Sequence, residues 1–154
     1  MNAQSPILAA DPFLLSLTIP GIPVGKGRPR FTTGGGFART YTPAKTRHYE
    51  DLIRSEAANA MGDRSPLDEA VSVTITTYVA MPKSFSKAKR INAAAGDIKP
   101  LTKPDIDQYA KAALDGCNAI IFRDDSCVTD LIVRKRYSER PRLVITIETG
   151  ADYA

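Results

Sequence analysis

Hydrophobic and polar residues alternate in several segments of the chain, and this alternation predicts β-strands. In residues 71–79, Val71, Val73 and Ile75 alternate with serine and threonine, which indicates a half-exposed strand. The stretch FLLSLTI has similar strand character and is ended by Pro20. With two later apolar segments, which are joined by a turn at 138–141, the predicted strands are residues 13–19, 71–79, 127–137 and 142–148.

A helical spacing of hydrophobic residues predicts helices at residues 43–60 and 105–118, and we expect a short basic helix at residues 84–94. For the first helix, Thr42 is the expected cap and Pro43 occupies the favoured first position. Its hydrophobic stripe should consist of Tyr49, Leu52, Ile53, Ala57 and Ala60. Glycine predicts a loop or an irregular hairpin at residues 21–36, and glycine and proline predict a loop at residues 95–104. The short apolar segment 119–122 predicts a strand or a turn.

The order of these elements predicts the fold class. Some strands follow each other directly and others are separated by helices, so we expect a mixed β-sheet packed with helices. This is an α/β (α+β) fold, and a length of 154 residues agrees with one domain. We expect a flexible arm at residues 1–10 and a single domain at residues 11–150.

Composition indicates a soluble globular protein, with 43% hydrophobic and 25% charged residues. No run of about 18 apolar residues is free of charge, which argues against a membrane span. Cys117, Cys127 and His48 are too few for a four-ligand zinc site. The first residues lack the basic segment and long apolar run of a secretory signal, so we expect a cytoplasmic protein with reduced, half-buried thiols.

The net charge of +4 is unevenly distributed along the chain. Residues 26–47 carry six basic side chains and no acidic one, and two further basic segments lie at 83–103 and 134–142. Residues 105–130 instead carry six aspartates against two basic side chains. One such run is ordinarily a solvated face. An acidic cluster between basic segments suits a site that binds a polyanion together with a cation.

The helix at 105–118 carries the most informative residues. Asp105 and Gln108 have the spacing of a capping box, which would place the Asp105 carboxylate at the positive end of the helix. Asp107, Lys111 and Asp115 are each four residues apart and therefore share one polar face. The opposite, buried stripe should consist of Ile106, Ala110, Ala113 and Cys117. Taken alone, this segment also fits an ordinary amphipathic helix with two ion pairs.

A second acidic segment, Arg123-Asp-Asp-Ser126, follows the apolar residues 119–122. Aspartate is common in turns, so a simple turn is one interpretation. If the turn folds back beside the helix start, three or four carboxylates converge, and such a set is stable mainly with a bound hard cation. Mg²⁺ suits one to three carboxylates together with water and substrate phosphate oxygens.

The loop Gly25-Lys-Gly-Arg-Pro-Arg-Phe31 places Lys26, Arg28 and Arg30 at alternate positions. In an extended chain these side chains point the same way. Glycine leaves the backbone open to phosphate, and Phe31 and Phe37 could stack on a base. A flexible, solvated loop is the alternative.

Several of these motifs occur in a similar order in a known family. The runs are Lys103-Pro-Asp-Ile-Asp-Gln-x-x-Lys-x-x-Leu-Asp, Asn118-x-x-x-Phe-x-Asp-Asp-Ser-x-Val-x-Asp130, and Val133-Arg-Lys-Arg-Tyr-Ser138. With the basic loop and Tyr41-Thr-Pro43, they resemble the RusA family of Holliday-junction resolvases over residues 13–148. Many members have Asn directly after the second Asp, where this chain has Gln108.

The resemblance implies a mixed α/β homodimer of a phage or bacterial cell that cuts four-way DNA junctions by paired, symmetric nicks. It also implies Mg²⁺ as cofactor, held by Asp105, Asp107 and Asp125, with Lys111 as the functional lysine. We expect Lys26, Arg28, Arg30 and Lys103 to contact DNA. For the dimer interface, the candidates are residues 127–133 and the apolar residues 120–122.

Two other functions compete with this interpretation. One is a non-catalytic DNA-binding module, although carboxylates beside phosphate bring such a module no benefit. The other is a metal-dependent nuclease that acts on flaps, other branched DNA or RNA. Cleavage of a four-way junction, a flap and a plain duplex, with and without Mg²⁺, separates the three.

Overall fold

The computed structural model describes residues 12–27, 30–32, 39–41 and 43–150. Its elements in chain order are β1 (Leu14–Pro20), β2 (Arg30–Thr32), β3 (Arg39–Tyr41), α1 (Ala44–Met61), β4 (Val71–Ala80), α2 (Lys87–Ala94), α3 (Ile106–Cys117), the 3-10 turn η2 (Asp125–Cys127), β5 (Val128–Ser138) and β6 (Arg142–Thr149). Residues 1–10, which we expect to be an arm, lie outside the described residues. No helix in the described part is long and apolar enough to cross a membrane.

Four strands form a mixed sheet in the order β1-β6-β4-β5, which confirms the predicted fold class. β4 runs parallel to β5 and antiparallel to β6. The residues after Ser138 do connect β5 to β6, but the two strands are not paired because β4 lies between them. β4 is therefore a central strand and more buried than its alternation suggested, with both Ser72 and Thr77 buried.

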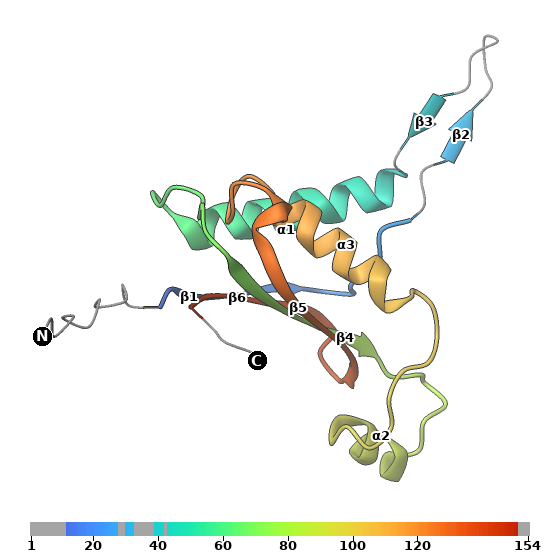
Figure 1. Ribbon diagram of the computed structural model, residues 1–154. Helices are drawn as coiled ribbons and strands as arrows, with labels where there is room; N and C mark the ends of the chain where they lie inside the picture. The colour runs from blue at the N-terminus through green and yellow to red at the C-terminus, as the bar shows by residue number, and fades with distance from the viewer. Residues whose placement is uncertain (1–11, 28–29, 33–38, 42, 151–154) are drawn as a thin grey trace, which may run out of the picture.

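Helices α1 and α3 cover one face of this sheet, whereas α2 lies apart from them at one end (Figure 1). The short hairpin of β2 and β3 forms a separate two-stranded sheet. The core lies between the main sheet and the two covering helices and contains Ile53 of α1, Ala113 of α3 and Ile145 of β6. A Cβ atom on Gly116 would lie 2.4 Å from Ile53 Cγ2, so the two helices cross at close range and α3 is held firmly on α1.

Packing changes several details of the predicted elements. Leu52 and Ile106 belong to the predicted stripes but are 39% and 43% exposed, because neither lies on the face that meets the sheet or the other helix. Pro43 is the N-cap of α1 rather than its first helical residue, and Thr42 lies outside the described residues. Both cysteines are free and buried rather than half-buried, and burial raises the pKa of the Cys117 thiol to about 12.

Candidate functional site

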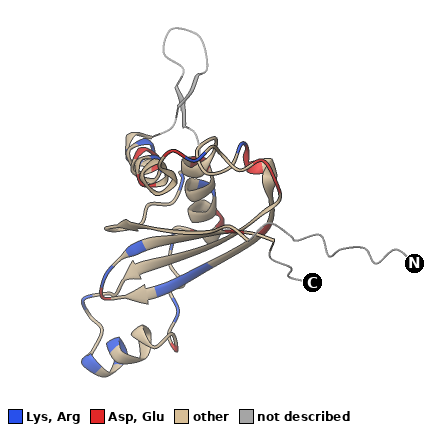
Figure 2. Ribbon diagram, turned by 90° about the vertical axis from the view of Figure 1, so that its left-hand side faces the viewer, with Lys and Arg blue, Asp and Glu red and all other residues tan. Residues whose placement is uncertain are grey.

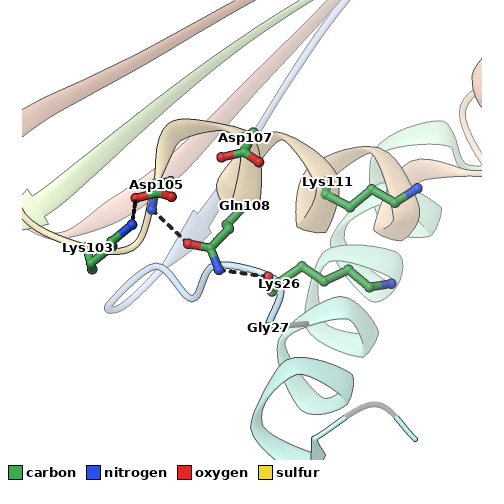
Figure 3. A pocket seen from close by; sticks show the side chains of 7 residues that line it. All are labelled: Lys26, Gly27, Lys103, Asp105, Asp107, Gln108 and Lys111. Atoms are coloured by element: carbon green, nitrogen blue, oxygen red, sulfur yellow. Dashed lines mark hydrogen bonds and ion pairs between the residues drawn. The ribbon is translucent and has the colours of Figure 1, made fainter. Parts of the chain in front are cut away.

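An open hollow of about 590 Å³ lies at the start of α3 (Figure 3). Two carboxylates and three ammonium groups line it, together with an amide side chain and a glycine: Asp105, Asp107, Lys26, Lys103, Lys111, Gln108 and Gly27. These residues come from the loop after β1, the loop before α3 and the first turns of α3. The structure therefore brings together six of the residues singled out in the sequence, including both carboxylates of the Asp-x-Asp motif.

Asp105 is the N-cap of α3, as its spacing from Gln108 predicts. The capping box is present, and Gln108 Oε1 accepts a hydrogen bond of 2.8 Å from the Asp105 backbone N–H. Lys103 Nζ lies 2.6 Å from Asp105 Oδ1 in an exposed ion pair. These contacts fix the Asp105 backbone at the positive end of the helix, where a negative charge is favoured.

Asp107 lies in the first turn of α3 and is exposed. Figure 3 shows its carboxylate on the same side of the helix start as that of Asp105. In the part of the chain that the structure describes, Asp107 has neither an ion pair nor a hydrogen bond to its side chain. The positive end of the helix dipole therefore stabilises the Asp107 carboxylate, and both of its oxygens can accept an external ligand.

Gln108 also attaches the basic loop to α3. The Lys26 N–H donates to the Gln108 carbonyl at 2.9 Å, and Gln108 Nε2 donates to the Lys26 carbonyl at 3.3 Å. A Cβ atom on Gly25 would lie 2.6 Å from Pro104 Cβ, so only glycine fits this contact without a shift. The Gln108 amide thus has a defined structural role: it holds residues 25–27 against the start of α3.

Lys26 and Lys111 meet two acidic side chains beside the hollow. Lys26 Nζ lies 2.9 Å from Glu50 Oε1 and also pairs with Asp115, whose other oxygen lies 3.2 Å from Lys111 Nζ. Burial alone lowers the pKa of Lys26, but the hydrogen bonds and charges of Asp115 and Glu50 outweigh it and the net pKa is raised. The ammonium of Lys26 is therefore neutralised within the protein, whereas Lys111 remains 57% exposed at the hollow.

Lys135 on β5 supports the loop that leads into α3. Its ammonium donates to the carbonyls of Thr102 and Pro104, at 2.6 and 3.0 Å. These carbonyls flank Lys103, whose side chain pairs with Asp105. Sequence reasoning did not single out Lys135, because it stands in a run of three basic residues and its partners lie 31 and 33 positions away.

Asp125 does not join the two carboxylates of the hollow. Its backbone N–H donates to Asn118 Oδ1 at 2.9 Å, and Asn118 is the C-cap of α3. Because α3 has 12 residues, about 18 Å of helix separates this turn from the N-terminal carboxylates. Among the described residues, no three acidic, histidine or cysteine side chains are grouped closely enough to hold one metal ion.

The neighbouring Asp124 serves the turn itself. Its side chain accepts a hydrogen bond of 3.2 Å from the Ser126 N–H, and hydrogen bonds to Ser126 lower the pKa of the Asp124 carboxyl. Asp124 therefore acts as the cap of η2. Of the Asp-Asp pair, Asp124 thus caps the turn, and Asp125 is the carboxylate that we consider for the active site.

Two of the residues predicted to bind DNA cannot be placed. Arg28 lies outside the described residues, and for Arg30 the structure describes the backbone in β2 but not the side chain. Lys103, by contrast, is 82% exposed at the rim of the hollow.

Comparison with known proteins adds independent information. A family model described as "Endodeoxyribonuclease RusA" matches residues 20–148. The uncharacterized protein YqaN of Bacillus subtilis (strain 168) is 37% identical over 135 residues, which cover 86% of this chain and 94% of that protein. The matched region includes every residue that lines the hollow, strands β4 and β5, and all of β6 but Thr149, whereas β1 enters it only with Pro20.

Proposed function

This chain belongs to the RusA family of endodeoxyribonucleases, and from that premise we propose that it resolves four-way DNA junctions by Mg²⁺-dependent, paired and symmetric nicks in DNA recombination and repair. The observation that carries the proposal is the hollow at the start of α3. There, the carboxylate of Asp107, which has no ion pair with any described residue, lies beside Asp105, and Lys26, Lys103 and Lys111 line the same hollow.

The donor chemistry of the hollow fits a magnesium ion. Asp105 and Asp107 supply hard carboxylate oxygens, and Mg²⁺ in phosphate-processing sites is usually held by one or two carboxylates and by substrate oxygens and water. When bound, the ion would lower the pKa of a coordinated water and offset the charge that develops on the phosphate. The two carboxylates also orient the site, because both are fixed to the rigid first turn of one helix.

The lysines perform different tasks in this proposal. Lys111 and Lys103 are exposed at the hollow and hold the scissile phosphate or a neighbouring one by charge. Lys26 instead neutralises Asp115 and Glu50, which would otherwise repel the DNA backbone close to the site. Arg28 and Arg30 contact further phosphates through the basic loop, without reading the base sequence.

Asp125 can bind the same magnesium ion as Asp105 and Asp107 only if it comes from a second copy of the chain. Within one chain it is held at the opposite end of α3. A homodimer with two-fold symmetry also provides the two active sites that paired nicks in a nearly two-fold symmetric junction require. We therefore propose a homodimer in which Asp125 of each subunit faces the Asp105–Asp107 pair of the other.

Cleavage of a defined set of substrates tests the proposed function. A labelled four-way junction, a flap, an RNA duplex and a plain DNA duplex are incubated with the protein, with and without Mg²⁺. The proposal expects symmetric nicks in the four-way junction only, and only with the metal. Preferential cutting of the flap or RNA would assign a different nuclease activity, and tight junction binding without cleavage under any metal would indicate a binding module.

A further inference from the structure

A basic surface around α2 lies outside the hollow at the start of α3. It consists of five cationic residues from the segment before α2, from α2 itself, from the turn after β5 and from the start of β6: Lys83, Lys87, Lys89, Arg140 and Arg142 (the α2 surface). Figure 2 shows basic residues on α2 and on the neighbouring ends of the strands. A hollow of about 440 Å³ separates the end of α2 from Arg140 and Arg142, and Glu139 also lines it.

Packing of the core does not account for α2. Ala93 is the one buried side chain among its eight residues, and Ile91 is 61% exposed. In the part of the chain that the structure describes, Lys83, Lys87 and Lys89 form no ion pair. Lys89 Nζ instead lies 4.5 Å from the centre of the Phe85 ring. The helix and the segment before it therefore display three cations that no described carboxylate neutralises, and the helix itself contributes little apolar burial to the domain.

The charges on α2 are arranged against its own helix dipole. Lys87 and Lys89 stand in the first turn, where backbone N–H groups already create positive potential, and the first turn has no acidic residue. Cations at this end destabilise a helix by a few tenths of a kcal/mol each, whereas anions stabilise it. Lys87 and Lys89 therefore destabilise α2 in the isolated domain, but they contribute favourably once an anion binds at the N-terminus of the helix.

Contacts with the sheet hold α2 in a fixed position. Arg90 Nη1 lies 3.2 and 3.3 Å from the two carboxylate oxygens of Glu139, and Arg90 Nη2 donates to the Pro82 carbonyl at 3.3 Å. The rings of Phe85 and Tyr137 meet edge to face at 5.4 Å between centroids. The cations of the α2 surface are therefore presented on a firm support rather than on a loose segment.

Arg142 is held in a similar way at the other side of this surface. Its guanidinium lies 3.8 Å from the centre of the Tyr78 ring, and its Nη1 donates to Ser138 Oγ at 3.1 Å and to the Arg140 carbonyl at 2.9 Å. A guanidinium fixed in this manner loses little further freedom when it binds a phosphate.

Strand β5 links the α2 surface to the hollow. Lys135 of this strand holds the loop that carries Lys103, while Tyr137 and Glu139, two and four residues later, hold α2. At about 3.3 Å per residue, the two sets of anchoring contacts are roughly 7–13 Å apart along the strand. Phosphates of one DNA strand follow each other at intervals of about 3.4 Å of helix axis.

From these observations we propose that the α2 surface binds the phosphate backbone of the DNA arm that leaves the hollow. The inference rests on the proposed function, because it assigns the arm of the same substrate to a second contact region. Recognition is by charge alone, so it is independent of base sequence and adds to the salt dependence of binding. It would hold the arm in a fixed direction relative to the Asp105–Asp107 pair.

A matched pair of double variants tests the proposal. Lys87→Gln with Lys89→Gln removes two charges from α2 and keeps residues that favour helix formation. Arg54→Gln with Arg64→Gln removes two charges on and after α1, away from α2, so both proteins have the same net charge. The affinity of each protein for a four-way junction is measured by fluorescence anisotropy over a range of salt concentrations, in Ca²⁺ or without metal so that no cleavage occurs.

The proposal expects the α2 variant to bind more weakly, with a slope of log affinity against log salt that is shallower by about 1.8, at 0.9 for each lost phosphate contact. The control variant should keep the wild-type slope. The melting temperature of the α2 variant should change little, because relief of the unfavourable interaction with the helix dipole offsets the loss of the contact between Lys89 and the Phe85 ring. A reduced melting temperature with an unchanged slope would assign the two lysines a structural role and overturn the proposal.

The failure of this inference can be distinguished from the failure of the proposed function. If the wild-type protein does not bind the junction, the proposed function is wrong. If it binds, but the α2 variant and the control have the same slope as the wild type, the α2 surface is a solvated face and the inference is wrong. Loss of binding to phosphatidylserine vesicles by the α2 variant, with unchanged DNA binding, would assign the surface to anionic lipid instead.

Discussion

Lysine residues that look alike in the sequence have different roles in the folded protein. Lys26 neutralises Glu50 and Asp115, Lys111 remains exposed at the hollow, and Lys135 holds two backbone carbonyls. The basic character of each segment could be predicted from sequence, but these roles could not. The partners of Lys26 lie 24 and 89 positions away, so only the tertiary fold decides which cations remain available to DNA.

The stabilising contribution of Lys26 should depend on pH in the alkaline range. Its pKa in the folded protein is raised above the ordinary value of 10.5, so folding favours the protonated form. That contribution is fully present below pH 10.5 and is lost as the pH rises through the higher, folded-state pKa. The difference in unfolding free energy between the wild type and Lys26→Met, measured by urea denaturation, should therefore shrink above pH 10.5. A difference that stays constant there would show that the ammonium is not stabilised by Glu50 and Asp115.

Lys135→Met should destabilise the protein and impair the active site together. The change removes hydrogen bonds from a charged donor to the carbonyls of Thr102 and Pro104, which we expect to cost about 1–3 kcal/mol of unfolding free energy. Junction cleavage should fall because the loop before Asp105 loses its support, and Lys135→Arg should restore part of it. As control, Arg134→Met at the exposed neighbouring position should change stability by less than about 0.5 kcal/mol. Equal effects of the two methionine variants would contradict this role for Lys135.

At the scale of elements, the sequence is most informative where the determining contacts are local. The bounds and cap of α3 follow from Asp105 and Gln108, which interact within one helical turn. The order of the strands depends on contacts between distant segments, and nothing in the short turn between β5 and β6 reveals that β4 lies between them. For the same reason the position of Asp125 relative to α3 could not be predicted: it depends on a hydrogen bond to Asn118 in the folded chain.

The junction between the basic loop and α3 should tolerate no side chain at Gly25. In Gly25→Ala the new methyl group would lie 2.6 Å from Pro104 Cβ, in a contact that cannot relax by a simple rotation. Overpacking of this kind typically costs about 1–3 kcal/mol. At Gly27 the nearest atom would be Thr46 Oγ1 at 3.7 Å, an ordinary contact, so Gly27→Ala should be far less destabilising. Thermal unfolding of both variants is the measurement, and equal melting temperatures would contradict the close packing of the loop on α3.

At the scale of the whole molecule, the structure narrows the search for a dimer interface. Ile121 and Phe122, which seemed available for subunit contacts, are fully buried in the core of a single chain. Strand β5 is at the edge of the sheet, and its Leu131 is 43% exposed. Of the two candidates, the segment 127–133 therefore keeps an accessible edge and an apolar side chain for a second copy.

Mixing two inactive variants tests whether the active site is shared between subunits. Asp107→Asn and Asp125→Asn should each abolish cleavage alone. In a mixed dimer, one active site contains both substituted residues, and the other contains the unchanged Asp107 of one subunit and the unchanged Asp125 of its partner. Mixing should therefore restore nicking of one strand per junction. Light scattering should report about twice the monomer mass for the wild type. A monomer, or a mixture that stays inactive although subunits exchange, would contradict the shared site.

The most direct test of the central claim compares Asp107→Asn with Asp51→Asn. Both variants remove one exposed carboxylate charge from a helix and keep its size, but Asp51 lies on α1 and pairs with Arg54 outside the hollow. Cleavage of a labelled four-way junction in Mg²⁺ and binding of the same junction are measured on each protein. If the hollow at the start of α3 is the active site, Asp107→Asn should slow cleavage by about 100-fold or more while binding persists or tightens, because a repulsive charge beside phosphate is lost. Asp51→Asn should cleave like the wild type. Cleavage by Asp107→Asn at the wild-type rate would contradict the account.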